Sequence, residues 1–159
     1  MKICSKVVKT VSAEETQYIG KQLGEMLKSG CIVCLDGEMG AGKTAMSQGL
    51  LRGLGVEGYI TSPTYSLVNE YETKDNNVKI FHFDVYRLES IDDLYDIGFE
   101  EYLKDSILII EWASIIRSEL NGNIIDIYLE KGDKIDERNI KISGPCDFIQ
   151  KIDSIKGEF

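Results

Sequence analysis

Two apolar stretches without polar alternation indicate strands that are buried on both faces. They cover residues 31–35 and 106–112. Such strands are typical of parallel sheets that carry helices on either side. Apolar residues recur at helical spacing before the first stretch, at Ile19, Leu23, Met26 and Leu27, and after it, at Met46, Leu50 and Leu54. The pattern therefore predicts an α/β fold.

Capping signals predict where these two helices begin and end. Residues 12–15 read Ser-Ala-Glu-Glu, which has the Ser-x-x-Glu form of a capping box, so the first helix should begin just after Ser12. Glycine readily adopts the left-handed backbone that ends many helices. We expect Gly30 to end the first helix and Gly55 to end the second.

Further segments predict strands that enlarge the sheet. Residues 66–71 and 78–88 should form a hairpin through a turn at 74–77, and residues 123–130 and 138–142 a second hairpin around Gly132 and Asp133. Residues 6–10 resemble an edge strand, and short helices are expected from Ser90 to Gly98 and over 146–152. No linker interrupts the chain, which predicts one domain over residues 1–159.

The stretch from Gly37 to Thr44 reads GEMGAGKT and satisfies the phosphate-binding pattern G-x-x-x-x-G-K-[ST]. Glycines let the backbone amides turn toward one anion, and a helix that starts at the end of the loop adds its positive dipole. Lys43 would reach the terminal phosphates, and the Thr44 hydroxyl would face Mg²⁺. Because a buried strand precedes the motif and a helix follows it, we predict a nucleotide site.

Three other segments carry candidate chemistry. Glu111 ends the second apolar stretch, at the sheet edge where parallel strands bind ligands, and is a natural partner for Mg²⁺. His82, Asp84 and Tyr86 share one face of a strand, which indicates either a cleft wall or an ordinary exposed face. Residues 62–65 read Ser-Pro-Thr-Tyr and form either a sensor of the γ-phosphate or a simple turn.

Composition excludes several classes of function. The net charge of −9 predicts poor direct binding to RNA or DNA. No apolar run approaches the ~20 residues of a membrane span, and the N-terminus lacks signal-peptide features, which predicts a cytoplasmic protein. Cys31 and Cys34 should face opposite sides of their strand as buried apolar residues. A single histidine excludes a His-rich metal site.

Several motifs together resemble the bacterial TsaE family, also called YjeE. They are Gly37–Thr44, residues 62–65 and 67–71, His82–Leu88, Gly98-Phe99 and Glu111-Trp112. The resemblance spans roughly residues 8 to 142. It implies a P-loop NTPase-like three-layer sandwich with a mixed, largely parallel sheet and added β-hairpins. It also implies an ATPase needed for threonylcarbamoyladenosine (t6A) in tRNA, which acts with a TsaD-like transferase and its TsaB-like paralogue and meets tRNA only through them.

The resemblance also implies roles for single residues. Residues 38–44, that is Glu38, Met39, Gly40, Ala41, Gly42, Lys43 and Thr44, would hold the phosphates of ATP or ADP. Thr44, Asp84 and Glu111 would surround Mg²⁺, with Lys43 and both carboxylates acting in catalysis. One of the two carboxylates would also order the attacking water; the sequence does not decide which, and we assign this role to Glu111. Arg138 would approach the nucleotide from the C-terminal hairpin, and residues 10–12, including Ser12, would contact the adenine end. Trp112 would pack against either the nucleotide or a partner.

Ala45 and Ala113-Ser114 depart from the commonest family pattern without removing a group that phosphate chemistry requires.

Two other functions fit the same phosphate loop. A small-molecule kinase would transfer the γ-phosphoryl group, but such enzymes usually close an arginine-rich lid over it, and the four arginines of this chain are scattered. A nucleotide-dependent binding module would use ATP only to control partner binding. Comparing partner binding with ADP, ATP and a non-hydrolysable analogue separates that module from an ATPase.

Overall fold

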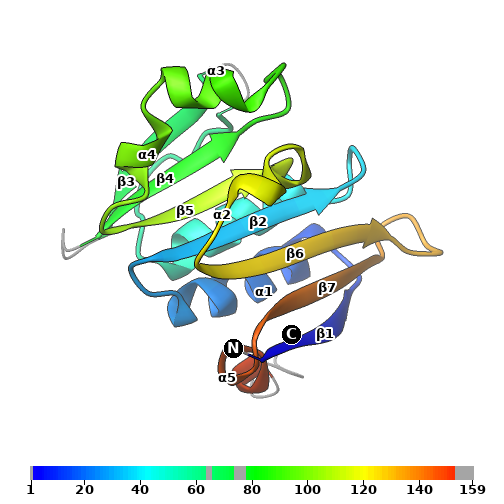
Figure 1. Ribbon diagram of the computed structural model, residues 1–159. Coiled ribbons are helices and arrows are strands. Elements are labelled where there is room, and N and C mark those ends of the chain that lie inside the picture. Colours follow the sequence, from blue (N-terminus) through cyan, green and yellow to red (C-terminus); the bar gives the residue numbers. More distant parts are fainter. Residues whose placement is uncertain (1, 64–65, 74–77, 153–159) are drawn as a thin grey trace.

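The computed structural model describes residues 2–63, 66–73 and 78–152. In these residues a seven-stranded sheet has the strand order β1-β7-β6-β2-β5-β4-β3 (Figure 1). The strands are β1 (Ile3–Thr10), β2 (Cys31–Gly37), β3 (Val68–Glu72), β4 (Lys79–Asp84), β5 (Ser106–Glu111), β6 (Asn123–Lys131) and β7 (Arg138–Pro145). The helices are α1 (Ala13–Met26), α2 (Lys43–Gly53), α3 (Ile91–Asp96), α4 (Phe99–Tyr102) and α5 (Cys146–Lys151), with 3₁₀ turns η1 (Ala113–Ile115) and η2 (Arg117–Glu119).

The sheet is mixed, and its parallel part lies at the centre. Strands β6, β2, β5 and β4 run parallel, while β3 and the β7–β1 pair extend the sheet antiparallel on the two sides. The apolar stretches at 31–35 and 106–112 become the neighbouring strands β2 and β5. The predicted buried parallel strands, both hairpin pairings and the edge position of β1 are therefore confirmed. The turn expected at 74–77 lies outside the described residues.

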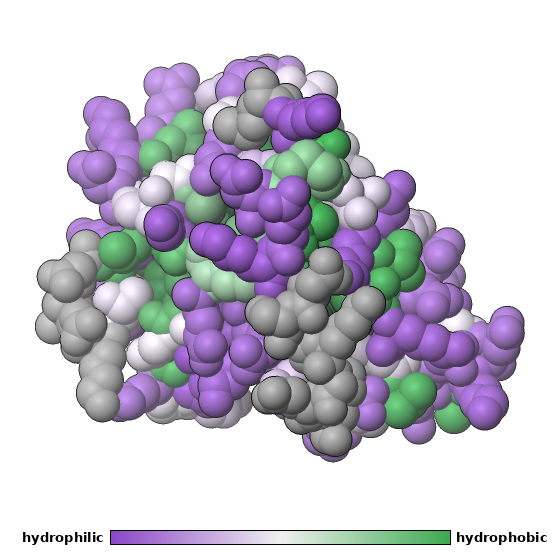
Figure 2. All heavy atoms as spheres, turned by 90° about the horizontal axis from the view of Figure 1, so that it is seen from below, coloured by the Kyte–Doolittle hydropathy of each residue, from purple (hydrophilic) through white to green (hydrophobic). Residues whose placement is uncertain are grey.

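Two layers of helices cover the sheet. Helices α1 and α2 pack on one face with the apolar side chains of Val33 and Leu35, whereas α3, α4 and η1 pack on the other with Ile32 and Cys34. This alternation along β2 confirms that Cys31 and Cys34 face opposite sides, and burial raises the pKa of the Cys34 thiol to about 12. The three-layer sandwich is confirmed. Figure 2 shows hydrophilic side chains over much of one outer face, with hydrophobic residues between them.

The start of α1 follows the capping prediction, but its end does not. The Ser12 hydroxyl accepts a hydrogen bond from the Glu15 amide at 3.1 Å, and the Glu15 carboxylate accepts one from the Val11 amide at 3.0 Å. The helix ends at Met26 rather than at Gly30, because Leu27 is extended and packs in the core. Gly30, with φ of 96°, instead forms the turn into β2.

Helices α1 and α2 approach each other through glycines. A Cβ atom on Gly49 would lie 2.3 Å from the carbonyl oxygen of Gln17, and one on Gly24 would lie 2.3 Å from that of Leu50. Only residues without a side chain allow this backbone contact. The contact fixes α2, and with it the loop at residues 37–44, against α1.

A disulfide joins Cys4 of β1 to Cys146 at the start of α5, across 142 residues of sequence. The sequence analysis did not foresee this pair, which becomes adjacent only because β1 and β7 are neighbours. Among the described residues, no helix has the length and apolar character needed to cross a bilayer.

Candidate functional site

The glycine-rich loop, residues 37–44, connects β2 to α2 at the carboxyl ends of the parallel strands. Gly37, Gly40 and Gly42 have φ values of 147°, 79° and 107°. A Cβ atom on Gly37 would lie 2.4 Å from the carbonyl oxygen of Leu129, so a larger residue does not fit there. Helix α2 begins at Lys43, and no side chain caps its first turn. The first amides of a helix have no partner within it, so they can bind an anion.

Lys43 is buried beneath this loop, with 7% of its surface exposed. Its Nζ donates hydrogen bonds to the carbonyl oxygens of Gly37 at 2.6 Å and Glu38 at 2.9 Å. Burial lowers the pKa of Lys43, and the negative charge of Glu111 acts in the opposite direction. The lysine therefore tethers the loop to its own helix and places a cation at the loop.

Trp112 covers the same ammonium group. Its ring centroid lies 4.1 Å from Nζ of Lys43 and 4.7 Å from the ring centroid of Tyr86. The backbone of Trp112 is left-handed, with φ of 61°, and its amide donates to the carbonyl oxygen of Leu35 at 2.9 Å. A left-handed backbone is uncommon for a bulky residue. The sequence left the place of Trp112 open, and the structure puts it against Lys43.

Two carboxylates end adjacent strands beside the loop. Asp84 of β4 and Glu111 of β5 are register partners at the carboxyl ends of these parallel strands. Burial raises the pKa of Asp84, whose Oδ1 accepts a hydrogen bond from the Tyr86 amide at 3.0 Å. Oε2 of Glu111 lies 2.6 Å from Nε2 of His82 and 3.2 Å from Oγ of Ser47. The end of β5 thus carries a buried, anchored carboxylate.

These donors fit Mg²⁺ bound together with a phosphate. No group of three or more His, Cys, Asp or Glu side chains in the described part of the chain could hold a metal ion. Magnesium, however, usually takes one or two protein carboxylates and completes its shell with phosphate oxygens and water. Asp84, Glu111 and the exposed hydroxyl of Thr44 match that pattern.

A cleft of about 480 Å³ brings most of these groups together. Its lining contains the predicted residues Lys43, Thr44, Asp84 and Glu111, together with Arg87, which the sequence analysis did not assign. The remaining lining residues are Met39, Gly40, Gly42, Ser62, Tyr86 and Trp112. Of the proposed sensor at 62–65, Ser62 and Pro63 are described and Ser62 lines the cleft, whereas Thr64 and Tyr65 lie outside the described residues.

Residues 10–12, Glu38, Ala41 and Arg138 were expected to contact the ligand but do not line this cleft. Ser12 caps α1, whereas Glu38 and Ala41 belong to the loop and are exposed and buried, respectively. The Arg138 guanidinium donates to the carbonyl oxygens of Ala41 at 3.1 Å and Gly40 at 3.2 Å, so it braces the loop through its backbone.

The predicted polar row on the second hairpin arm is shorter than expected. Strand β4 ends at Asp84, and the chain then turns at Tyr86, so only His82 and Asp84 share a strand face. His82 is 2% exposed, which contradicts an exposed face, and its contact with Glu111 was not foreseen. Ser47 was also missed. Its position four residues after Lys43 on α2 could have placed it on the same helix face.

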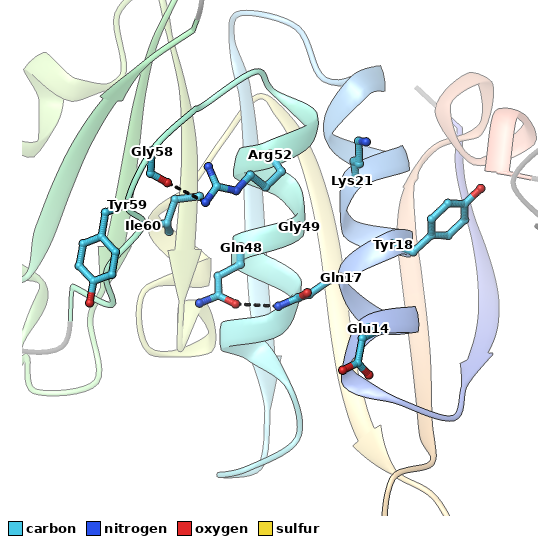
Figure 3. A pocket seen from close by; sticks show the side chains of 10 residues that line it. All are labelled: Glu14, Gln17, Tyr18, Lys21, Gln48, Gly49, Arg52, Gly58, Tyr59 and Ile60. Carbon is cyan, nitrogen blue, oxygen red and sulfur yellow. Dashed lines mark hydrogen bonds between the residues drawn. The ribbon is translucent and has the colours of Figure 1, made fainter. Parts of the chain in front are cut away.

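A second hollow, of about 550 Å³, lies elsewhere, between α1, α2 and residues 58–60 (Figure 3). There Gln17 donates a hydrogen bond to Gln48 at 2.8 Å, and Arg52 donates one to the carbonyl oxygen of Gly58 at 2.7 Å. None of the predicted site residues lines it. The cleft at the glycine-rich loop is therefore the candidate site.

A three-layer α/β sandwich with a strand, a glycine-rich loop and a helix at the carboxyl edge of its parallel strands defines the P-loop NTPase-like fold. The structure is similar to the crystal structure of Bacillus subtilis YdiB, with a TM-score of 0.75 and 26% sequence identity, covering 98% of this chain and 96% of that chain.

Sequence comparison identifies the family. The profile of the family described as "Threonylcarbamoyl adenosine biosynthesis protein TsaE" matches residues 10–140, and the chain belongs to this TsaE family. Relatives named tRNA threonylcarbamoyladenosine biosynthesis protein TsaE include one from Rickettsia felis, 40% identical over 74% of this chain and 68% of its own length. Another, from Bacillus subtilis, is 37% identical over 83% of this chain and 81% of its own length. The family resemblance in the sequence is thereby confirmed.

Proposed function

We propose that the chain binds ATP with Mg²⁺ in the cleft and hydrolyses it slowly with water. The observation that carries this proposal is the meeting of the tethered Lys43 with the paired carboxylates Asp84 and Glu111 at the end of the glycine-rich loop. Positioning and charge neutralisation supply most of the catalysis in phosphoryl transfer. A loop, a cation and two carboxylates are the groups that this chemistry uses.

Each group has a separate task. The amides of residues 38–44 and the Lys43 ammonium bind the phosphates, and Thr44, Asp84 and Glu111 hold Mg²⁺. When bound, Mg²⁺ neutralises the charge that develops on the phosphate oxygens. Glu111 also orders the attacking water, because its carboxylate is anchored at the cleft. Ser12 and its neighbours are proposed to contact the adenine end, and Arg138 keeps the loop in shape.

The arginines favour hydrolysis over transfer to a small molecule. Arg52 donates to the carbonyl oxygens of Val56 and Gly58, Arg117 pairs with Asp126, and Arg138 braces the glycine-rich loop. Of the four arginines, Arg87 alone lines the cleft. A kinase lid would need several arginines over the transferred phosphate, so the placement of the arginines supports hydrolysis rather than transfer.

We further propose that ATP hydrolysis serves the t6A modification of tRNA, the process named in the family description. The chain would act on a complex of a TsaD-like transferase and a TsaB-like paralogue and reset its conformation between turnovers. A net charge of −9 disfavours direct tRNA binding, so tRNA would be reached through those partners. We propose that the chain acts in the cytoplasm.

A reconstitution tests the proposal. The purified chain is added to the two partners, carbamoyl donor, ATP and unmodified tRNA, and modified adenosine is measured. We expect repeated turnovers with wild type and none with Lys43→Ala. Equal modification without the chain would overturn the proposed role, and repeated turnovers on a non-hydrolysable ATP analogue would show that hydrolysis is dispensable. Phosphorylation of nucleosides or sugars well above ATP hydrolysis would instead favour the kinase.

A further inference from the structure

The only histidine of the chain is hydrogen-bonded to Glu111 in the core. Nε2 of His82 lies 2.6 Å from Oε2 of Glu111, and the two residues are 2% and 4% exposed. Strand alternation places His82 on the same face of β4 as Ile80, which packs in the cluster beneath α1 and α2. On this face the imidazole stands between the apolar Ile80 and Asp84 at the end of the strand, and it is directed at the carboxylate of the neighbouring strand.

The other neighbour of this carboxylate oxygen is engaged elsewhere. The Ser47 hydroxyl lies 3.2 Å from Oε2 of Glu111 but only 2.8 Å from the carbonyl oxygen of Lys43. A hydroxyl has one hydrogen, and the shorter contact within the helix takes it. His82 is therefore the one full-strength hydrogen-bond donor to this oxygen among the described residues.

The second ring nitrogen of His82 determines which tautomer is present. Nδ1 is buried, and no described residue forms a hydrogen bond with it. A proton on Nδ1 would leave a donor unsatisfied in the core, which is costlier than leaving a lone pair there. The geometry therefore places a proton on Nε2, directed at Oε2 of Glu111.

We propose that His82 is a positioning residue for ATP hydrolysis, which rests on the proposed function of Glu111. By donating its Nε2–H to Oε2, His82 fixes the rotamer of Glu111. The other oxygen, Oε1, then remains available to the cleft, where it orders the attacking water. Residues that hold a functional side chain in position do not touch the substrate themselves, but their loss typically lowers activity about 10- to 100-fold.

The hydrogen bond is tested first on the wild-type protein, without any substitution. Because the chain has one histidine, ring-¹⁵N-labelled histidine gives signals from His82 alone. We expect Nε2 to carry a proton that is held in the hydrogen bond to Glu111. An Nε2 without a proton would overturn the assignment, and this result does not depend on whether the chain hydrolyses ATP.

Two variants test the positioning role. His82→Leu keeps an apolar side chain of similar size but removes the donor. We expect kcat for ATP to fall about 10- to 100-fold, with the Kd for ATP changed less than about threefold, because Lys43 and the loop amides bind the phosphates. His82→Gln retains an amide donor near the position of Nε2, and we expect kcat within about threefold of wild type.

A double variant shows whether His82 acts through Glu111. Adding His82→Leu to Glu111→Gln should cause no further loss of kcat if the two residues act as a unit. A further loss as large as in the wild-type background, or equal kcat for His82→Leu and wild type, would overturn the positioning role. Absence of ATP binding and hydrolysis in the wild type would instead contradict the proposed function, and the NMR signals would still decide the hydrogen bond.

Discussion

Asp84 and Glu111 stand opposite each other as register partners at the carboxyl ends of β4 and β5. Burial raises the pKa of Asp84, and the negative charge of Glu111 raises it further. Two neighbouring carboxylates destabilise the folded chain unless a cation binds to both of them. The arrangement therefore indicates stability given up for ligand binding.

Asp84→Asn should stabilise the chain in the absence of ligand while weakening ATP binding with Mg²⁺. Asparagine keeps an oxygen to accept the Tyr86 amide hydrogen bond and removes one charge. We expect the free energy of unfolding at pH 7 to rise by about 0.2–1 kcal/mol, the usual scale of a like-charge pair across strands. Urea unfolding measures the gain, and a loss of stability without Mg²⁺ or nucleotide would contradict it.

The same variant gives a defined dependence on pH. Since the pKa of Asp84 is higher in the folded than in the unfolded chain, its charge costs stability at neutral pH. That cost disappears as the pH falls through the pKa that Asp84 has in the folded chain, because its carboxyl group then binds a proton. The advantage of Asp84→Asn should therefore shrink with acidification, as measured by urea unfolding between pH 7 and pH 4. An advantage that grew toward acid would contradict this sign.

Trp112 should report nucleotide binding directly. It is the only tryptophan, and its ring lies over the Lys43 ammonium, so any movement of that charge toward a phosphate alters its surroundings. Titration with ADP and Mg²⁺ should change the tryptophan emission saturably, and Lys43→Ala should move the change to at least about tenfold higher concentration. If calorimetry shows binding while emission stays constant, the expectation that Lys43 moves toward a bound phosphate is wrong.

Arg138→Ala should loosen the glycine-rich loop. The guanidinium donates to the carbonyl oxygens of Gly40 and Ala41, and a hydrogen bond from a charged group contributes about 1.5–3 kcal/mol. We expect the Kd for ATP, measured by calorimetry, to rise about tenfold, with little rescue in Arg138→Lys because an ammonium lacks the planar fork. The matched control is Arg117→Ala, which breaks a half-exposed pair with Asp126 away from the cleft and should leave the Kd unchanged.

Gly49→Ala separates helix propensity from helix packing. Propensity alone predicts a gain of about 0.5–1 kcal/mol for alanine within a helix. The added Cβ would lie 2.3 Å from the carbonyl oxygen of Gln17, and overpacking of this kind costs about 1–3 kcal/mol. We therefore expect thermal unfolding at lower temperature than in wild type. A higher unfolding temperature would show that α1 and α2 adjust freely.

Local sequence signals predicted the main elements of the fold, because a buried strand, a helix cap and a glycine-rich loop are each determined by residues that are close together in the chain. The buried runs became β2 and β5, the Ser12 capping box starts α1, and the glycine-rich loop leads into α2. The predicted end of α1 at Gly30 was wrong because the burial of Leu27 overrode the glycine signal. Burial depends on tertiary packing, which a local pattern does not contain.

The contacts between pairs of residues in the site could not be predicted from the sequence for the same reason. His82 and Glu111 are 29 residues apart and meet only because β4 and β5 are adjacent and in register. The Cys4–Cys146 disulfide likewise depends on the pairing of β1 with β7. The positions of Thr44 and Glu111 at the cleft could be predicted, because each belongs to a motif with a fixed place in a parallel sheet. The loop contacts of Arg138 needed the C-terminal hairpin to be placed first.

Isothermal calorimetry with ATP and Mg²⁺ shows whether the loop at residues 37–44 binds a nucleoside triphosphate. A folded wild-type chain should release or absorb heat that saturates at one nucleotide per chain, and Lys43→Ala, folded by circular dichroism, should bind at least about tenfold more weakly. No heat from wild type with ATP or ADP at millimolar concentration, or equal affinity in Lys43→Ala, would contradict the account.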